Sequence, residues 1–286
     1  MTYLRKPDWL KTRLISNAQF VHVNKIVKEH GLHTICSSGR CPNMSECWNK
    51  GTATFMILGE ICTRSCRFCN TLSGRPLPPD PAEPAKLADS IKLMDLHHAV
   101  ITSVDRDDLK DGGASHWAET IRAVKQVNPD TTLEVLIPDF DGKTEFIDLI
   151  IVEKPDIISH NLETVRSLTA SIRTKAKYDT SLKVLGYIAS QNVVAKTGIM
   201  LGLGEREEEV LALMDDALAV GCSILTIGQY MQPSRQNIAV SEYITPEKFE
   251  EYKQIGLLKG FAQVESAPLV RSSYCAEKHV IKKGQL

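Results

Sequence analysis

The sequence predicts an α/β fold built from six strand–helix units. From Thr52 onward, short apolar runs of strand length alternate with amphipathic stretches of helical spacing. This alternation is typical of parallel strands that are joined by crossover helices. The chain has 286 residues, which suits one large domain or two smaller ones with a full core. Six units could form an open, partial barrel or a flat doubly wound sheet, and periodicity alone does not separate the two.

The first predicted element is a helix near residues 18–30, where Phe20, Val23, Ile26 and Val27 have helical spacing. The rest of the segment before Thr52 is polar and irregular. The expected strands are residues 53–58, 99–104, 132–137, 157–160, 196–201 and 223–228. A further extended segment is expected over residues 261–264, just before the tail.

Helical patterns lie between the expected strands. Two apolar faces are formed by Leu87, Ile91 and Met94 and by Trp117, Ile121 and Val124. A third helix is expected to begin near Arg206, because the glutamates at 207–209 favour the positive end of a helix dipole. Thr245-Pro246 is a typical cap and first turn for a last helix, which we expect to run through Lys259.

Composition excludes several classes of function. Lys and Arg number 34 against 35 Asp and Glu, so the net charge is −1, and no basic run indicates a nucleic-acid surface. No apolar stretch reaches the roughly 18–20 residues that a membrane helix needs. The first ten residues lack the apolar run of a secretory signal, so we expect a cytoplasmic protein.

The cysteines are placed very unevenly. Six of the eight lie between residues 36 and 69, at positions 36, 41, 47, 62, 66 and 69. Dense cysteines in small secreted domains form disulfides, but this chain is large and we expect no export signal. We therefore expect these cysteines to bind a metal or a cluster.

Cys62, Cys66 and Cys69 have the spacing C-x3-C-x2-C and follow the first strand of the predicted sheet. Reactive residues of such folds lie in the loops after the strands. Three thiolates can hold three irons of a four-iron cluster and leave the fourth iron open for a ligand. Zinc is the alternative, but zinc sites usually take four ligands in paired halves, which this loop does not supply.

The same motif, with Phe68 before its last cysteine, resembles the signature of the radical S-adenosylmethionine (SAM) superfamily. In that superfamily the open iron binds the amino and carboxylate groups of SAM, and the fold is a partial (βα)6 TIM-like barrel. A second triple, Cys36-x4-Cys41-x5-Cys47, lies ahead of the motif, and the whole pattern resembles the lipoyl synthases. Further matching stretches are residues 5–10, 102–109, 138–140, 160–165, 197–205, 228–230 and 271–274.

This resemblance implies two 4Fe–4S clusters. Cys62, Cys66 and Cys69 would hold the radical SAM cluster and, with Ser273, form the catalytic set. The first triple would hold an auxiliary cluster, with Ser273 of the Arg-Ser-Ser-Tyr motif as its fourth ligand. Without the resemblance, a Ser-Ser pair would be interpreted as plain loop.

The resemblance also implies three parts of the chain. Residues 1–51 would be an N-terminal extension with the auxiliary-cluster cysteines, 52–260 the radical SAM barrel, and 261–286 a C-terminal extension. Both extensions would cover the mouth of the barrel. The auxiliary cluster would have ligands in both extensions, the first cysteine triple and Ser273. It would therefore hold both extensions over the mouth of the barrel.

Polar residues after three of the expected strands are candidates for binding SAM. They are Ser103, Asp105, Asn161, Glu163 and Gly202. Glycines such as Gly202 let the backbone approach a ligand closely. Each of these residues could equally be a helix cap or a turn.

The implied reaction is sulfur insertion at carbons 6 and 8 of an octanoyl chain that is held in amide linkage to a lysine. SAM cleavage would give a 5′-deoxyadenosyl radical that abstracts hydrogen, and the auxiliary cluster would be consumed as the sulfur source. Proton-transfer catalysis cannot reach unactivated C–H bonds, so the hard chemistry belongs to the cofactor and the protein positions it.

The implied partners are octanoylated lipoyl carrier domains, such as a 2-oxoacid dehydrogenase E2 or the glycine cleavage H protein, and a flavodoxin or ferredoxin as electron donor. Two other functions stay open. One is a different radical enzyme, such as a biotin-synthase-like sulfur inserter or a methylthiotransferase. The other is a zinc-binding structural module.

The sequence departs from the family pattern at three places. Thr174-Lys175 replaces a Pro-Gly pair after Arg173, Ala267 replaces a common glycine, and Cys275 follows the tail tyrosine. The cluster ligands are unchanged by these departures. Cys222 is expected to be a small core residue near the start of a strand.

Overall fold

The structure is a computed structural model, which describes residues 4–12, 16–50, 52–274 and 276–279. The chain forms two compact units. Among the described residues, the N-terminal unit comprises 16–50, 52–64, 71–158 and 276–279. The C-terminal unit comprises 4–12, 65–70 and 159–274, so the chain passes between the units several times.

The N-terminal unit contains a mostly parallel sheet with the strand order β1-β2-β5-β6-β7. Its strands are β1 (His33–Thr34), β2 (Thr54–Ile57), β5 (His98–Ser103), β6 (Thr132–Leu136) and β7 (Ile157–Ser159), the last ending at the unit boundary. β2, β5 and β6 are parallel, with Thr54 opposite Val100 and His98 opposite Thr132. The short strand β1 is antiparallel to β2.

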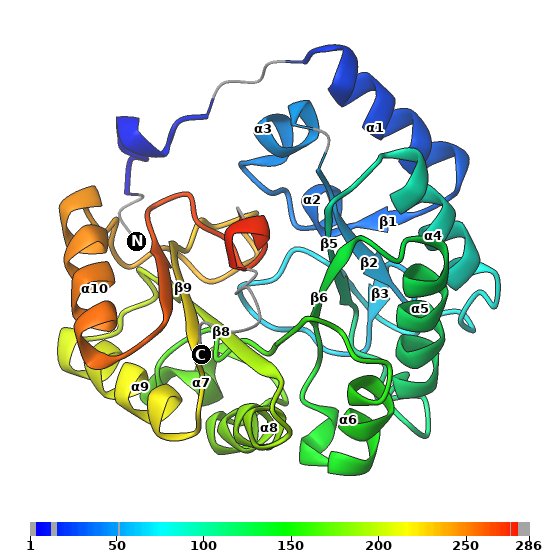
Figure 1. The fold of residues 1–286 in the computed structure, drawn as a ribbon. Helices are drawn as coiled ribbons and strands as arrows, with labels where there is room; N and C mark the ends of the chain where they lie inside the picture. The colour runs from blue at the N-terminus through cyan, green and yellow to red at the C-terminus, as the bar shows by residue number, and fades with distance from the viewer. Residues whose placement is uncertain (1–3, 13–15, 51, 275, 280–286) are drawn as a thin grey trace. The chain divides into compact units, whose positions relative to one another are not determined.

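Three helices of this unit pack side by side, as Figure 1 shows: α4 (Glu83–Leu93), α5 (Ala114–Val127) and α6 (Thr144–Ile151). The apolar faces predicted for α4 and α5 are buried, and Leu87, Trp117 and Ile121 are fully excluded from solvent. Burying such faces against the sheet is the main source of helix stability in a domain of this kind.

The first helix, α1 (Ala18–Glu29), confirms the predicted element. The side chain of Asn17 caps it by accepting the Phe20 N–H at 2.9 Å. The Phe20 ring packs on Trp48 of α3 (Met44–Asn49), with ring centroids 5.2 Å apart. A short helix, α2 (Ile35–Ser38), lies between α1 and α3.

The C-terminal unit has three parallel strands in the order β8-β9-β10: β8 (Val194–Leu201), β9 (Ile224–Gln229) and β10 (Gln263–Ser266). Its helices are α7 (Arg166–Ile172), α8 (Tyr178–Ser190), α9 (Glu207–Ala219) and α10 (Pro246–Lys259). As predicted, α9 begins after Arg206, where Glu209 completes a capping box, and Thr245 caps α10 by accepting the Lys248 N–H.

All six expected strands are present, as β2 and β5 to β9. The extended segment expected over 261–264 lies slightly later, as β10. The helices α2, α3, α6, α7 and α8 were not predicted, nor was the two-stranded sheet of β3 (Ile61–Cys62) and β4 (Leu72–Ser73). No helix in the described part of the chain is both long enough and apolar enough to cross a membrane.

Candidate active site

Cys62 lies in the N-terminal unit, at the end of β3. The pairing of β3 with β4 fixes its backbone, and the Cys62 carbonyl accepts the Gly74 N–H at 2.9 Å. The Cys62 sulfur accepts two backbone N–H groups, from Asp105 at 3.3 Å and from Arg64 at 3.4 Å. Hydrogen bonds to a cysteine sulfur are a main means by which a protein tunes an iron–sulfur cluster. The Cys62 thiol also donates to the Asp105 carboxylate at 3.7 Å. The two N–H groups suit a thiolate that binds iron, which would replace the proton shared with Asp105.

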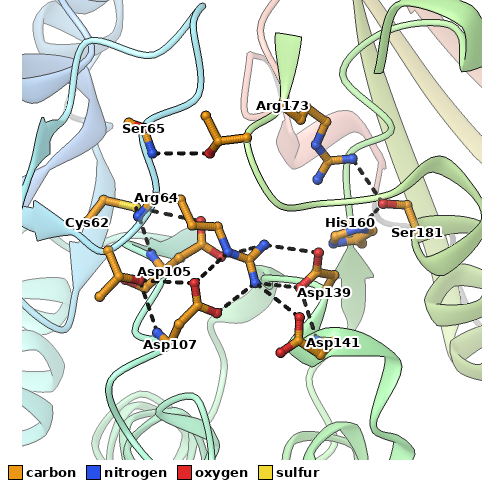
Figure 2. A network of polar contacts seen from close by, with 12 residues as sticks. Cys62, Arg64, Ser65, Asp105, Asp107, Asp139, Asp141, His160, Arg173 and Ser181 are labelled. Atoms are coloured by element: carbon orange, nitrogen blue, oxygen red, sulfur yellow. Dashed lines mark hydrogen bonds and ion pairs between the residues drawn. The ribbon is translucent and has the colours of Figure 1, made fainter. Parts of the chain in front are cut away.

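Arg64 is the centre of a buried ionic network in the same unit (Figure 2). Only 7% of this residue is exposed. The guanidinium forms a fork with Asp139 at 3.0 and 2.8 Å and a second fork with Asp107 at 2.9 and 2.9 Å. Asp105 lies 3.3 Å away. These carboxylates follow β5 and β6, so the network ties the loop of Cys62 to the carboxyl ends of two strands.

The charge state of Arg64 follows from these contacts. Burial by itself lowers the pKa of a guanidinium, but the hydrogen bonds to Asp107 and Asp139 outweigh it and raise the pKa of Arg64 above its usual value. Arg64 was not among the predicted site residues. The signal that could have found it is the set of aspartates that directly follow two expected strands.

Cys66 and Cys69 belong to the C-terminal unit. The Cys69 N–H donates to the Cys66 carbonyl at 3.0 Å, which closes a turn between them. The Arg67 backbone between them is held on both sides. Its N–H donates to the Ile172 carbonyl at 2.9 Å, and its carbonyl accepts the Ile238 N–H at 3.0 Å. The loop therefore presents both thiols from a backbone with fixed partners.

Two side chains of the C-terminal unit also hold this loop. Thr174 accepts the Ser65 N–H at 3.3 Å, and Asn237 donates from its side-chain amide to the Cys69 carbonyl at 2.8 Å. Thr174 is one of the departures from the family pattern, and its hydroxyl is an acceptor that proline does not have. Beside it, Arg173 is buried and donates to Ser181, which also contacts His160 (Figure 2).

The first cysteine triple lies entirely in the N-terminal unit. Cys36 is buried in α2, Cys47 lies in α3, and the Cys41 N–H donates to the Cys36 carbonyl at 3.0 Å. Burial raises the pKa of Cys36, and the nearby Cys41 raises it further. Burial also raises the pKa of Cys47 to about 12, with added repulsion from Cys36 and Cys41. The three sulfurs are thus close enough for their charges to interact.

This donor set fits an iron–sulfur cluster. All the cysteines in the described residues are free thiols. Mutual repulsion opposes three neighbouring thiolates, whereas iron cations reverse that preference and deprotonate a bound thiol. No group of three His, Cys, Asp or Glu side chains among the described residues is arranged to hold a single metal ion. A cubane binds each thiolate through a different iron, so it does not need such convergence.

Two of the residues expected to bind SAM carry buried polar atoms with no hydrogen-bond partner among the described residues: Ser103 Oγ in the N-terminal unit and Asn161 Oδ1 in the C-terminal unit. Buried polar groups in proteins are normally hydrogen-bonded, so each atom suits contact with a polar ligand. The Asn161 amide nitrogen already donates to Glu163 at 3.0 Å and to Ser272 at 2.7 Å. Asp105 is next to Cys62, as described above.

Gly202 follows β8 with a φ of +91°, in the left-handed region that favours glycine. A Cβ at this position would lie 2.2 Å from the Gln229 amide nitrogen and 2.3 Å from the Glu242 carbonyl, so only glycine fits. The Gly202 N–H donates to Glu205 at 2.5 Å, and burial raises the pKa of that carboxyl. The close approaches at Gly202 are thus to other parts of the protein, and its expected role in binding SAM stays a prediction.

Ser273 lies partly buried in the C-terminal unit, in a turn that the Tyr274 N–H closes on the Arg271 carbonyl at 2.9 Å. The first triple belongs to the other unit, and the ligand role of Ser273 stays a prediction. Cys275 lies outside the described residues. Cys222 is 2% exposed just before β9, which confirms its expected place in the core.

Comparisons with solved structures show the fold. The chain is similar to Streptococcus suis SuiB bound to S-adenosylmethionine, with a TM-score of 0.60 and 12% identity over 79% of this chain and 54% of that one. It is also similar to the methylornithine synthase PylB, with a TM-score of 0.58 and 11% identity over 83% of this chain and 74% of that one. These likenesses confirm the expected α/β fold of the partial-barrel type, and the described strands form no closed barrel.

Comparisons of sequence identify the family. Residues 56–217 match the model of the radical SAM superfamily. The lipoyl synthase of Parabacteroides distasonis is 67% identical over 97% of this chain and 99% of its own length. The lipoyl synthases of Phocaeicola vulgatus and Bacteroides fragilis are 64% and 63% identical, over 99% and 97% of this chain and 100% and 96% of their own lengths. The chain therefore belongs to the lipoyl synthase family of the radical SAM superfamily.

Proposed function

We propose that this chain is a sulfurtransferase that inserts two sulfur atoms, at carbons 6 and 8, into a protein-bound octanoyl-lysine and so forms the lipoyl group. The observation that carries this proposal is its identity of 62–67% with several lipoyl synthases over nearly the full chain. Enzymes of this family use S-adenosylmethionine and two 4Fe–4S clusters. When bound, these groups supply the radical that abstracts hydrogen and the sulfur that replaces it.

The protein's own contribution begins with Cys62, Cys66 and Cys69, which would hold the radical SAM cluster. Two backbone N–H groups already point at the Cys62 sulfur, and the backbone around Cys66 and Cys69 has fixed partners. A preorganised donor set of this kind costs little reorganisation when the metal group binds. The protein thereby fixes the position of the group from which the radical originates.

The auxiliary cluster would be held by Cys36, Cys41 and Cys47, with Ser273 as the fourth ligand. The three thiols interact through their charges, which supports a shared site. A serine oxygen is a harder and more basic ligand than a cysteine sulfur. The iron bound to Ser273 would therefore be the easiest to release when the cluster gives up sulfur.

SAM would be bound by Ser103, Asp105, Asn161, Glu163 and Gly202. The buried, unpartnered atoms of Ser103 and Asn161 support this assignment best. We also propose that residues 52–260 form the radical SAM barrel. Residues 1–51 and 261–286 would act as extensions that cover its mouth and exclude water and stray hydrogen donors from the radical.

The substrate is an octanoyl chain on a carrier protein, and the enzyme needs a donor of single electrons. We propose the octanoylated lipoyl domains of a 2-oxoacid dehydrogenase E2 or the glycine cleavage H protein as substrates. A flavodoxin or ferredoxin would be the donor, and the cytoplasm would be the compartment. The near-neutral net charge of −1 supports the absence of a nucleic-acid partner.

The direct test is mass analysis of an octanoylated H protein after anaerobic turnover with SAM and a reductant. We expect the gain of two sulfur atoms on the octanoyl-lysine. An unchanged octanoyl group, with SAM cleaved, would favour a different radical enzyme and contradict the proposal.

Metal analysis separates the proposal from a zinc-binding module. Anaerobically reconstituted protein should be brown and contain roughly eight irons per chain, as two four-iron clusters require. Colourless protein that contains zinc and no iron would contradict the proposal. Mössbauer spectroscopy on the same sample should resolve one iron with an unusual ligand set if Ser273 binds.

A further inference from the structure

The loop that carries Cys62 is fixed by an ionic network as well as by its backbone. Arg64 lies two residues after Cys62 and is almost fully buried, with its guanidinium in two forks (Figure 2). A buried charge is costly unless it is paired and hydrogen-bonded, so such an arginine strongly restrains the loop it belongs to. Five donors in a rigid plane allow a guanidinium to bind two carboxylates bidentately at once, which the three donors of a lysine ammonium cannot do.

The carboxylates come from two different strand ends. Asp107 follows β5 and Asp139 follows β6, so Arg64 is held against the sheet by two separate elements. A second tie joins the same parts, because the Thr63 hydroxyl donates to the Asp105 carbonyl at 3.0 Å and accepts the Asp107 N–H at 3.0 Å. The loop of residues 62–64 and the segment 105–107 therefore form one hydrogen-bonded body.

This hydrogen-bonded body determines which hydrogen bonds the Cys62 sulfur accepts. The sulfur accepts the N–H groups of Arg64 and Asp105, one from each half of the body. Any shift of residue 64 relative to residue 105 would change both hydrogen bonds together. The position of the guanidinium is thus coupled to the hydrogen bonding of the thiolate.

We propose that Arg64 is a positioning residue for the radical SAM cluster. Through its forks with Asp107 and Asp139, it holds Cys62 and its two N–H donors in the arrangement that retains the cluster, and its charge tunes the reduction potential. The inference rests on the proposed function only in taking Cys62 as a cluster ligand.

The expected effects separate geometry from charge. Arg64→Gln removes the forks and a positive charge, so the cluster should be lost faster, and its reduction potential should fall because adding an electron becomes less favourable. Arg64→Lys keeps the charge and loses the forks, so its potential should stay near that of the wild type while its cluster is lost faster. Losses from altering residues behind a metal ligand are typically about 10- to 100-fold in affinity.

The experiment uses the full chain reconstituted with iron and sulfide. A ferrous chelator is added, and the radical SAM cluster is followed by the part of the reduced EPR signal that changes when SAM is added. A redox titration of the same signal gives the potential. Arg67→Gln is the matched control, since Arg67 is an exposed arginine in the same loop whose guanidinium donates to a carbonyl. We expect this control to retain the cluster much longer than Arg64→Gln.

A second readout does not depend on the cluster. Hydrogen exchange at the amides of Arg64 and Asp105 should be faster in the cluster-free Arg64→Gln and Arg64→Lys chains than in the wild type. If Arg64→Gln does not fold, Asp107→Asn takes its place, because the fork with Asp139 remains. Its potential should rise, opposite to that of Arg64→Gln, and its amide exchange should also be faster.

The proposal is overturned if the arginine variant, or Asp107→Asn in its place, retains the cluster and protects these amides as the wild type does. It is also overturned if Arg67→Gln loses the cluster as fast as Arg64→Gln. Failure of the proposed function would be distinct: the wild type would bind its clusters and leave the octanoyl group unchanged.

Discussion

The two cysteine triples present their sulfurs in opposite ways. Cys62 lies at the end of a short strand, and its sulfur accepts two backbone N–H groups beside a buried guanidinium. Cys36 and Cys47 lie in short helices, where burial and neighbouring thiols raise their pKa values. In the first setting two N–H groups can stabilise a thiolate, whereas in the second burial disfavours a thiolate until a metal cation binds. This difference would suit the roles that we propose, with a lasting radical SAM cluster on the second triple and an auxiliary cluster on the first that is consumed.

The largest expected effect separates the roles of the triples. Cys66→Ala should abolish SAM cleavage, because the loop then lacks a ligand for one iron. Cys41→Ala should retain SAM cleavage and lose sulfur insertion. Chromatography for 5′-deoxyadenosine and mass analysis of the octanoylated H protein measure the two activities. Equal loss of cleavage in two folded variants would show that the triples do not divide the chemistry.

The next effect concerns the proposed oxygen ligand. Ser273→Ala should retain SAM cleavage but yield little lipoyl product, since the auxiliary cluster would lack its fourth protein ligand. Ser272→Ala is the matched control, because its hydroxyl accepts a hydrogen bond from Asn161, which we assign to SAM binding. It should affect the KM for SAM more than the cluster. Wild-type sulfur insertion by Ser273→Ala would argue against a ligand role.

A moderate effect is expected from the packing beneath the first triple. Trp48 is 3% exposed and packs on Phe20 of α1, next to Cys47. Trp48→Ala should lower the free energy of unfolding by roughly 3–5 kcal/mol and reduce auxiliary-cluster content. Trp9→Ala is the control, because Trp9 is 44% exposed, and surface changes usually stay within about 0.5 kcal/mol. Urea unfolding and iron content measure both, and equal effects would contradict the expectation.

The smallest effect is a pH dependence of the cluster-free protein. Burial raises the pKa of the Cys47 thiol to about 12 in the folded chain, against about 9.0 for an ordinary cysteine thiol. Its contribution to stability is therefore complete below pH 9 and is lost as the pH rises toward 12, since the unfolded chain loses the proton first. Cys47→Ser should show a shallower fall in denaturation midpoint over this range.

Cys222 gives the matching comparison. Burial also raises the pKa of Cys222 to about 12, so it should contribute a similar loss of stability. Loading with iron should remove the contribution of Cys47, whose proton is released on binding, and leave that of Cys222. If loading changes neither contribution, Cys47 is not a cluster ligand.

Much of the fold could be predicted from the sequence because its strands are short apolar runs with clear boundaries. Helix α6 could not, since Phe146, Ile147 and Leu149 to Ile151 form a nearly continuous apolar run that periodicity cannot assign. The helices α2 and α3 span only four and six residues, too few for a periodic pattern. The helical placement of Cys36 and Cys47 was therefore missed.

The two cysteine triples could be predicted as cluster ligands because their spacing is local, and this assignment stays a prediction. The network around Arg64 could not be predicted, because Asp139 is 75 positions away and a lone arginine between cysteines indicates no partner. Likewise, the hydrogen bond from the Gly202 N–H to Glu205 depends on a turn that the sequence does not indicate. Residues of a short motif can be found from the sequence alone. The residues that hold such a motif in place come from distant strand ends, so they are found only in the structure.

The buried Arg64 also determines how much of the protein must be transferred to move the cysteine loop to another scaffold. An engineer who grafts the eight residues from Cys62 to Cys69 onto another scaffold would import a guanidinium with no carboxylates to receive it, and a sulfur without the N–H of Asp105. The smallest segment set that could be transferred as a working unit comprises this loop together with the ends of the neighbouring strands β5 and β6. De novo radical enzymes that copy only the cysteine spacing should therefore assemble iron poorly, and adding this aspartate frame should be the first remedy.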